Sequence, residues 1–287
     1  MAKVLVKGLD FGEGPRWRDG QLWYSDFYRG AVFTTDLEGN ETKVCDVPTQ
    51  PSGLGWLPDG RLLVVSMTDR RVLRREPNGE LVTHADLSNI ATFHTNDMLV
   101  GPDGHAWVGN FGFDLHGMLE EIEVPEAIAK VHGSPADYAA RVAHVAPDGT
   151  ANPVGEPMLF PNGMVLSGGR LLIAETVAFR IQSYAVGPDG ALSDPQTFAS
   201  FAPDAGIAPD GICAGPNGGL FVAPALIPQV IQLDAQGQII ARHETSQITF
   251  APAWDGGSNL FAVTGPSSEP RHVQGQGLGA IEHIALD

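Results

Sequence analysis

The sequence predicts an all-β fold, a six-bladed β-propeller with four-stranded antiparallel blades. The first observation is a set of turn glycines that each precede a hydrophobic, strand-like run: Gly20, Gly60, Gly104, Gly169, Gly218 and Gly257. The second is another set of turn glycines two strands later in the repeat: Gly39, Gly79, Gly149, Gly190 and Gly237. Asp-Gly and Asn-Gly between apolar runs indicate hairpins, because glycine accepts the positive φ that such turns need. Their regular recurrence predicts a repeat rather than isolated hairpins.

The elements of each repeat follow from the spacing of these glycines. Gly39 lies 19 residues after Gly20, which leaves room for two strands and a tight turn. The helix that joins parallel strands does not fit in that space, so each repeat forms an antiparallel sheet of about four strands. The sixth repeat stops at its third strand, AIEHIALD, while an extra strand, KVLVKGL, precedes the first repeat. We therefore expect residues 3–7 to close the ring as the outermost strand of the last blade, in a single domain spanning 1–287.

The third repeat is longer than the others. Gly149 lies 45 residues after Gly104, and the additional chain, GMLEEIEVPEAIAKVHGSPADYAARVAHV, is rich in helix formers with a break at Gly-Ser-Pro. This composition predicts an inserted helical or loop segment at about 115–141. The segment is either a lid over a site or a surface decoration or oligomer contact, and the sequence leaves both open.

Charge and hydropathy exclude several classes of partner. The net charge of -17 argues against binding of nucleic acid or of an anionic membrane, and a solvated acidic surface that aids solubility explains it. No apolar run approaches the length that crosses a bilayer, and the first residues lack the apolar segment and cleavage site of a signal peptide. We expect a cytoplasmic protein with a small-molecule partner, no nucleic acid and no membrane. The oligomeric state stays open.

The inner strands of the repeats carry the candidate site. EGPRW, SGLGW, NDMLV, NGMVL, DGICA and APAW occupy the same place in successive blades, and innermost strands face the channel of a propeller. The residues that should converge on the axis are Glu13, Ser52, Asn96, Asn162, Asp210 and Ala251. Each alone could simply bond to backbone or water. Together, two carboxylates raise one another's pKa unless a cation neutralises them, and two amide oxygens complete an oxygen set suited to Ca²⁺, Mg²⁺ or Mn²⁺.

Four of these segments resemble a known family. EGPRW, NDMLVGPDG, FPNGMVL and PDGICAGPNG are similar to the signature segments of the senescence marker protein (regucalcin), gluconolactonase and luciferin-regenerating enzyme group of six-bladed propellers, in the same order along the whole chain. The resemblance implies that Glu13, Asn162 and Asp210 bind one divalent metal ion. Ca²⁺ is the first expectation, with Mg²⁺, Mn²⁺, Fe²⁺ and Zn²⁺ as alternatives. The resemblance also implies that Asn96 contacts the substrate or a water on the metal.

The resemblance further implies an activity, because members of this family are mostly lactonases. We expect a metal-dependent hydrolase of the carboxylic ester class that opens a small-molecule lactone, with Asp210 as general base or a hydroxide on the metal in its place. The sequence has no G-x-S-x-G elbow, which removes the commonest serine-hydrolase route. The same ligands could instead serve another ester or phosphotriester hydrolase, or a non-catalytic metal- or ligand-binding propeller.

One position departs from the sugar-lactone members. Relatives of regucalcin carry Arg two residues before the site Asn, whereas this chain has His94 in FHTND. Arginine offers a fixed fork of donors for polyol or carboxylate oxygens, and histidine offers one or two at shorter reach. We predict that His94 binds substrate and shifts preference away from sugar acids; the alternative is a loop-end residue that touches nothing. Which lactone is the substrate stays open.

Overall fold

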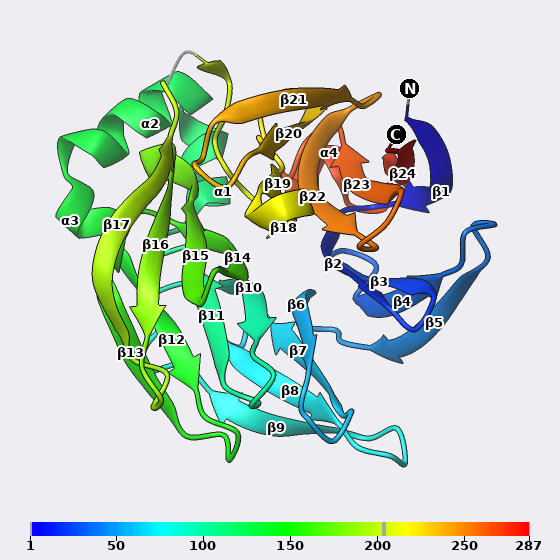
Figure 1. The fold of residues 1–287 in the computed structure, drawn as a ribbon, viewed down its shortest axis with the longest axis horizontal. Coiled ribbons are helices and arrows are strands. Elements are labelled where there is room, and N and C mark those ends of the chain that lie inside the picture. The colour runs from blue at the N-terminus through cyan, green and yellow to red at the C-terminus, as the bar shows by residue number, and fades with distance from the viewer. Residues whose placement is uncertain (1, 203–204, 287) are drawn as a thin grey trace.

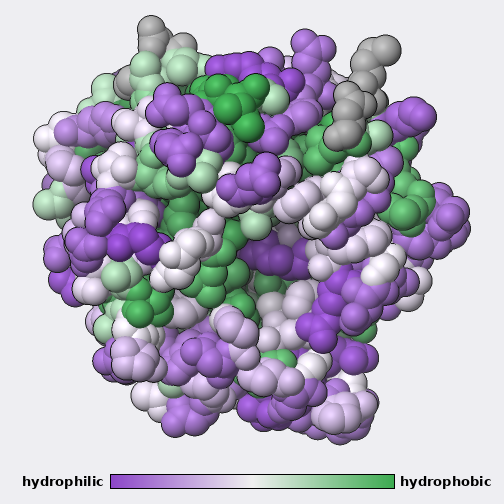
Figure 2. Space-filling view, in the orientation of Figure 1, coloured by the Kyte–Doolittle hydropathy of each residue, from purple (hydrophilic) through white to green (hydrophobic). Residues whose placement is uncertain are grey.

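Six four-stranded antiparallel sheets surround a central channel in the computed structural model, which describes residues 2–202 and 205–286 (Figure 1). The innermost strands of the blades are β2, β6, β10, β14, β18 and β22. The face seen down the channel is hollowed near the centre of the ring, with hydrophilic residues at the bottom of the hollow (Figure 2). The predicted fold class and blade number are confirmed.

The first three blades run from the innermost to the outermost strand in chain order. The strands of the first blade are β2 (Gly12–Arg18), β3 (Gln21–Asp26), β4 (Ala31–Thr35) and β5 (Glu41–Asp46). Those of the second are β6 (Pro51–Trp56), β7 (Leu62–Ser66), β8 (Arg71–Arg75) and β9 (Leu81–Asp86). Those of the third are β10 (Thr95–Val100), β11 (Ala106–Asn110), β12 (Ala140–Val145) and β13 (Ala151–Met158).

The other three blades repeat this order until the ring closes. The fourth comprises β14 (Pro161–Ser167), β15 (Arg170–Glu175), β16 (Arg180–Val186) and β17 (Leu192–Ser200). The fifth comprises β18 (Ile212–Ala214), β19 (Leu220–Val222), β20 (Gln229–Leu233) and β21 (Ile239–Glu244). The sixth comprises β22 (Ile248–Trp254), β23 (Asn259–Gly265), β24 (Gly279–Ala285) and, as its outermost strand, β1 (Lys3–Leu9).

The N-terminal strand closes the ring as predicted, and it is two residues longer than the expected 3–7. β1 pairs antiparallel with β24, from Lys3 opposite His283 to Leu9 opposite Gly279. Leu9 is fully buried and joins a core cluster that also contains Phe261 of β23. The seam is therefore held by backbone pairing and by apolar packing, and the two ends of the chain lie side by side (Figure 1).

Turn glycines and close-contact glycines set the shape of the ring. Ten of the eleven turn glycines have positive φ, as predicted, and in the sixth repeat Gly256 takes this conformation in place of Gly257. Other glycines allow innermost strands to touch. A Cβ on Gly53 of β6 would lie 2.2 Å from the Met98 nitrogen of β10, and a Cβ on Gly163 of β14 would lie 2.4 Å from the Ile212 nitrogen of β18. These contacts bring neighbouring inner strands, and the residues before the glycines, close to the axis.

The third blade carries the inserted segment as three helices between β11 and β12. These are α1 (Leu115–Glu121), α2 (Val124–Gly133) and α3 (Pro135–Tyr138), and a further short helix, α4 (Pro270–Val273), lies between β23 and β24. The helix α2 buries Ala127 and Val131. Its His132 Nε2 lies 2.6 Å from the Val177 carbonyl oxygen, in the 3₁₀ turn η1 (Thr176–Ala178), so the insertion is attached to the fourth blade. In the described part of the chain, no helix is long and apolar enough to cross a membrane.

Candidate active site

Side chains from the inner strands of four blades, and from the segment just before β18 in the fifth, line one cavity of about 260 Å³. They are Glu13, Ser52, Asn96, Asn162 and Asp210. All five are buried, and each of the first four is the second residue of its strand, so the repeat places them at one level of the channel. The sixth aligned residue, Ala251, is buried in an apolar core cluster instead. We call this polar group of five residues the floor of the cavity.

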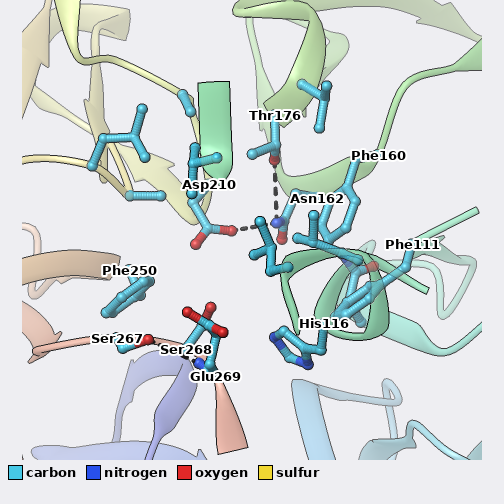
Figure 3. Close-up of a pocket in the computed structure, with 18 of the residues that line it drawn as sticks. Phe111, His116, Phe160, Asn162, Thr176, Asp210, Phe250, Ser267, Ser268 and Glu269 are labelled. Atoms are coloured by element: carbon cyan, nitrogen blue, oxygen red, sulfur yellow. Dashed lines mark hydrogen bonds between the residues drawn. The ribbon is translucent and has the colours of Figure 1, made fainter. Parts of the chain in front are cut away.

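Hydrogen bonds connect the fourth and fifth blades at the floor. Asn162 Nδ2 donates to Asp210 Oδ1 and also lies 3.3 Å from Thr176 Oγ1 (Figure 3). The Thr176 hydroxyl donates in turn to the Pro209 carbonyl oxygen at 2.8 Å. In the first blade, Glu13 Oε2 accepts the Gly14 N–H at 2.9 Å. The Asp210 carboxylate is thus held by the Asn162 amide, and the Glu13 carboxylate by the backbone N–H of Gly14.

The floor is rich in negative charge. Burial raises the pKa of Glu13 well above its ordinary value, and the charges of Asp210 and Asp97 raise it further. Burial and the charge of Asp97 also raise the pKa of Asp210, while the bond from Asn162 opposes the shift. Asp97 itself has a partner, because Arg16 Nη2 lies 3.0 Å from its Oδ1. A cation between Glu13 and Asp210 would favour both charged forms.

The donor set fits such a cation. Asn96 Nδ2 donates to the Pro161 carbonyl oxygen at 3.2 Å, but its Oδ1 is buried and has no hydrogen-bond partner among the described residues. Gly109 leaves space beside this oxygen, since a Cβ there would lie 2.5 Å from it. Two carboxylates and two amides offer the oxygen ligands that hard divalent ions prefer. Between residues 2 and 286, outside the gap at 203–204, no group of three His, Cys, Asp or Glu side chains could hold a metal, so a site here needs the asparagines.

The remainder of the cavity is apolar. Seven aromatic rings line it: Phe11, Phe27, Phe111, Phe113, Phe160, Phe179 and Phe250. The inserted helices add a further set, here called the roof: Leu115 and Leu119 of α1 with Val124, Ala127, Ile128 and Val131 of α2. Opposite His116, the loop before α4 contributes Ser267, Ser268 and Glu269 (Figure 3). The inserted helices therefore line the cavity.

His94 does not lie with the floor residues. It lines a neighbouring hollow with Asp114 and Glu120, and its ring stacks on Phe93 with 4.2 Å between centroids. Burial lowers the pKa of His94. The two hollows share Phe27, Phe111 and His116, so His94 lies beside the cavity rather than in it.

Sequence reasoning did not identify His116. This residue lies in α1, points into the cavity, and has a pKa lowered mainly by burial, so that the neutral imidazole is favoured (Figure 3). Its ring packs edge-on against Phe111, with centroids 6.1 Å apart. The repeat gives His116 no equivalent in other blades, and no spacing signal marks it. Only the path of the inserted helices brings it to the site.

Known proteins are similar to almost the whole chain. The family description "SMP-30/Gluconolactonase/LRE-like region" matches residues 11–264, a segment that contains every floor residue. The chain is similar to the pentonolactonase XacC of Haloferax volcanii, with 25% identity over 271 residues that cover 92% of this chain and 83% of that protein.

Solved structures share the fold. A gluconolactonase from Xanthomonas campestris has a TM-score of 0.73 at 21% identity, covering 99% of this chain and 89% of that one. The calcium-binding protein regucalcin from Agrobacterium tumefaciens has a TM-score of 0.77 at 21% identity, covering 100% and 95%. A luciferin-regenerating enzyme has a TM-score of 0.78 at 16% identity, also covering 100% and 95%. At these identities the likeness shows the propeller fold alone.

Proposed function

The chain belongs to the SMP-30/Gluconolactonase/LRE-like family, as its sequence resemblance predicted, and from that membership we propose that it is a divalent-metal-dependent lactonase. The observation that carries the proposal is the pair of buried carboxylates, Glu13 and Asp210, in one cavity with Asn162 bonded to Asp210. The similar proteins named pentonolactonase and gluconolactonase support the reaction class. The substrate is a small molecule, in keeping with an enclosed cavity.

Glu13, Asn162 and Asp210 would hold the metal ion. Their oxygen donors suit Ca²⁺ first, which the similar calcium-binding regucalcin supports, with Mg²⁺, Mn²⁺, Fe²⁺ and Zn²⁺ as alternatives. When bound, such an ion offsets the charge of the two carboxylates and polarises the lactone carbonyl.

Asp210 is the proposed general base. It takes a proton from the attacking water and returns it to the ring oxygen as the C–O bond breaks, so that one water is added and one hydroxy acid is formed. Burial raises the pKa of Asp210 in the metal-free protein, and a bound cation would favour the charged form that accepts the proton. The Asn162 amide fixes the orientation of this carboxylate. Asn96, in the floor of the same cavity, contacts the substrate.

Metal analysis combined with a lactone screen tests the proposal. The protein is treated with chelator, reloaded with Ca²⁺, Mg²⁺, Mn²⁺, Fe²⁺ or Zn²⁺, and assayed with sugar, aliphatic and aromatic lactones by a pH indicator. We expect ring opening that disappears with the chelator and returns with the metal. Metal binding measured by calorimetry without turnover of any lactone would instead indicate a binding propeller or a hydrolase of another ester or phosphotriester.

A further inference from the structure

The roof of the cavity presents six apolar side chains along two helices, with His116 of α1 beside them. Leu115 and Leu119 lie one turn apart on α1, and α2 contributes Val124, Ala127, Ile128 and Val131. This surface is held in place, because Val131 and Ala127 are buried and His132 is attached to the Val177 carbonyl oxygen. A ligand body that contacts this roof gains stability by removing apolar surface from water.

The aromatic wall is equally fixed. Phe111 and Phe160 pack with ring centroids 4.4 Å apart, and Phe11 and Phe250 with centroids 4.8 Å apart. Rings that already pack on one another need little reordering when a ligand arrives. The cavity is therefore a preformed apolar site with polar groups gathered at its floor, an arrangement typical of sites for amphipathic small molecules.

A polyhydroxylated ligand would find few donors here. Among the described residues that line the cavity there is no Lys or Arg, and the polar side chains outside the floor are limited to Thr176, His116, Ser267, Ser268 and Glu269. The side-chain amide hydrogens of Asn96 and Asn162 are directed to Pro161 and Asp210, and the Thr176 hydroxyl is directed to a backbone carbonyl. Each sugar hydroxyl buried without a partner would lose its hydrogen bonds to water, which is costly.

Two exposed apolar residues lie where the cavity meets solvent. Val124 at the start of α2 is 40% exposed and Leu226 in the loop before β20 is 37% exposed, and both line the cavity. Exposed apolar groups at the opening of a cavity indicate that an apolar ligand covers them when it binds.

From these observations we infer that the substrate is a lactone whose body is an alkyl chain or an aromatic ring, rather than a sugar lactone. This inference rests on the proposed lactonase function. The lactone carbonyl faces Asp210 at the floor, and the apolar substituent lies along α1 and α2 toward Val124 and Leu226. The substrate class is then set by the insertion, and the reaction by the inner strands.

Substrates that share one ring and differ in their substituent test the inference. The metal-loaded, full-length protein is assayed with δ-hexalactone, δ-octalactone, δ-decalactone and glucono-δ-lactone, each corrected for uncatalysed hydrolysis. We expect kcat/KM to rise by up to about fourfold for each added methylene that is fully buried. Glucono-δ-lactone should be the poorest substrate. A flat series, or glucono-δ-lactone turned over as well as δ-decalactone, would overturn the apolar class while the lactonase proposal stands.

A polar substitution in the roof tests whether this surface causes the dependence of kcat/KM on chain length. Ile128→Asn should remove most of the chain-length dependence, while Ile240→Asn, the same change at a site on β21 that is 58% exposed and outside the cavity, should leave it intact. Leu119→Asn provides a second roof variant if Ile128→Asn does not fold. Equal chain-length dependence in roof and control variants would overturn the inference.

Thermal unfolding separates this inference from the activity. If no lactone is hydrolysed with any metal, the lactonase proposal fails, and melting temperatures with the same lactones decide the ligand class. A melting temperature that rises with chain length, and does not rise in Ile128→Asn, supports an apolar ligand. No shift with any δ-alkyl lactone overturns it.

Discussion

The floor and the roof of the cavity are built in different ways. The floor consists of equivalent residues from successive blades, and their positions are fixed by inner strands that touch through glycines such as Gly53 and Gly163. The roof consists of two short helices that interrupt one blade and have no counterpart elsewhere in the ring. The repeated framework positions the charged groups, and the insertion adds an apolar surface that is the proposed contact of the substrate.

The largest effect is expected from removing charge at the floor. Asp210→Asn keeps the shape of the side chain but removes the proposed base and a metal ligand, so kcat/KM should fall about 10²–10⁴-fold. Metal affinity measured by calorimetry should fall as well, and Glu13→Gln should weaken it too. Asp19→Asn, at an exposed turn, serves as the matched control with native values. Native metal affinity in both floor variants would contradict the proposal that Glu13 and Asp210 bind the metal ion.

The same charges predict how stability depends on pH. Because the pKa values of Glu13 and Asp210 are raised in the folded protein, the folded state holds more protons than the unfolded state. The free energy of unfolding of the metal-free protein should therefore decrease as pH rises from the unfolded carboxyl value, near 4, through the folded values. Above those values the contribution should level off.

Added Ca²⁺ should then stabilise the protein more at pH 8 than at pH 5, since at low pH it must displace protons. Melting temperatures with chelator and with Ca²⁺ at the two pH values check this. The Glu13→Gln, Asp210→Asn double variant should lose both the pH dependence and the stabilisation. An equal gain at pH 5 and pH 8 would show that the carboxylates do not couple to the ion.

Backbone contacts at the floor predict the next largest effect. Gly163→Ala would force a Cβ against the backbone of Ile212, so we expect a loss of about 1–3 kcal/mol in the free energy of unfolding, measured with denaturant. Gly133→Ala is the matched control at the end of α2, where a Cβ would have nothing within 4 Å. There a gain of up to about 1 kcal/mol is expected, because alanine favours helix. Equal losses in the free energy of unfolding for the two variants would contradict the prediction that close backbone contacts at the floor make Gly163 the more sensitive position.

A smaller effect is expected beside the roof. His94 lies in the adjacent hollow, so His94→Arg should change preference toward a polyol lactone by only about tenfold, or about 1.4 kcal/mol in the barrier. The ratio of kcat/KM for glucono-δ-lactone and a plain δ-lactone in both proteins measures the shift. His105→Arg, at a turn outside both hollows, is the control. An unchanged ratio would mean that position 94 does not contact the substrate.

The sequence predicted the floor better than the roof for a physical reason. Inner-strand positions follow from local turns that recur, so aligning EGP, PSG, PNG and PDG was enough to place residues from distant blades in one cavity. The repeat also carries the strand that closes the ring, β1. Which end of the blade the insertion leaves, and which helix face turns inward, depends on packing between distant segments. For this reason His116 was missed, and His94 was grouped with residues from which the structure separates it.

The third inner strand also contains a residue, Asp97, whose role could not be predicted from the sequence. Asp97 stands where the first, second, fourth and fifth inner strands have glycine, and no local pattern explains it. The structure does, because Arg16 of β2 reaches Asp97 and also donates to the Met98 carbonyl oxygen at 2.7 Å. Partners 81 positions apart leave no trace in the repeat. The symmetry of the blades is thus broken by an ion pair between two inner strands that only the folded ring brings together.

The closing strand also determines when folding can finish. Lys3 pairs with His283, so β1 is synthesised first but has no partner strand until β24 has left the ribosome. Blades one to five can form earlier from contacts that are local in sequence, whereas the seam needs a contact between the two ends, which is slow because a long loop must close. Without β1, the edge of β24 would stay unpaired and could recruit another chain. Deleting residues 2–9 should therefore favour aggregation during synthesis more than it changes chemistry at the floor.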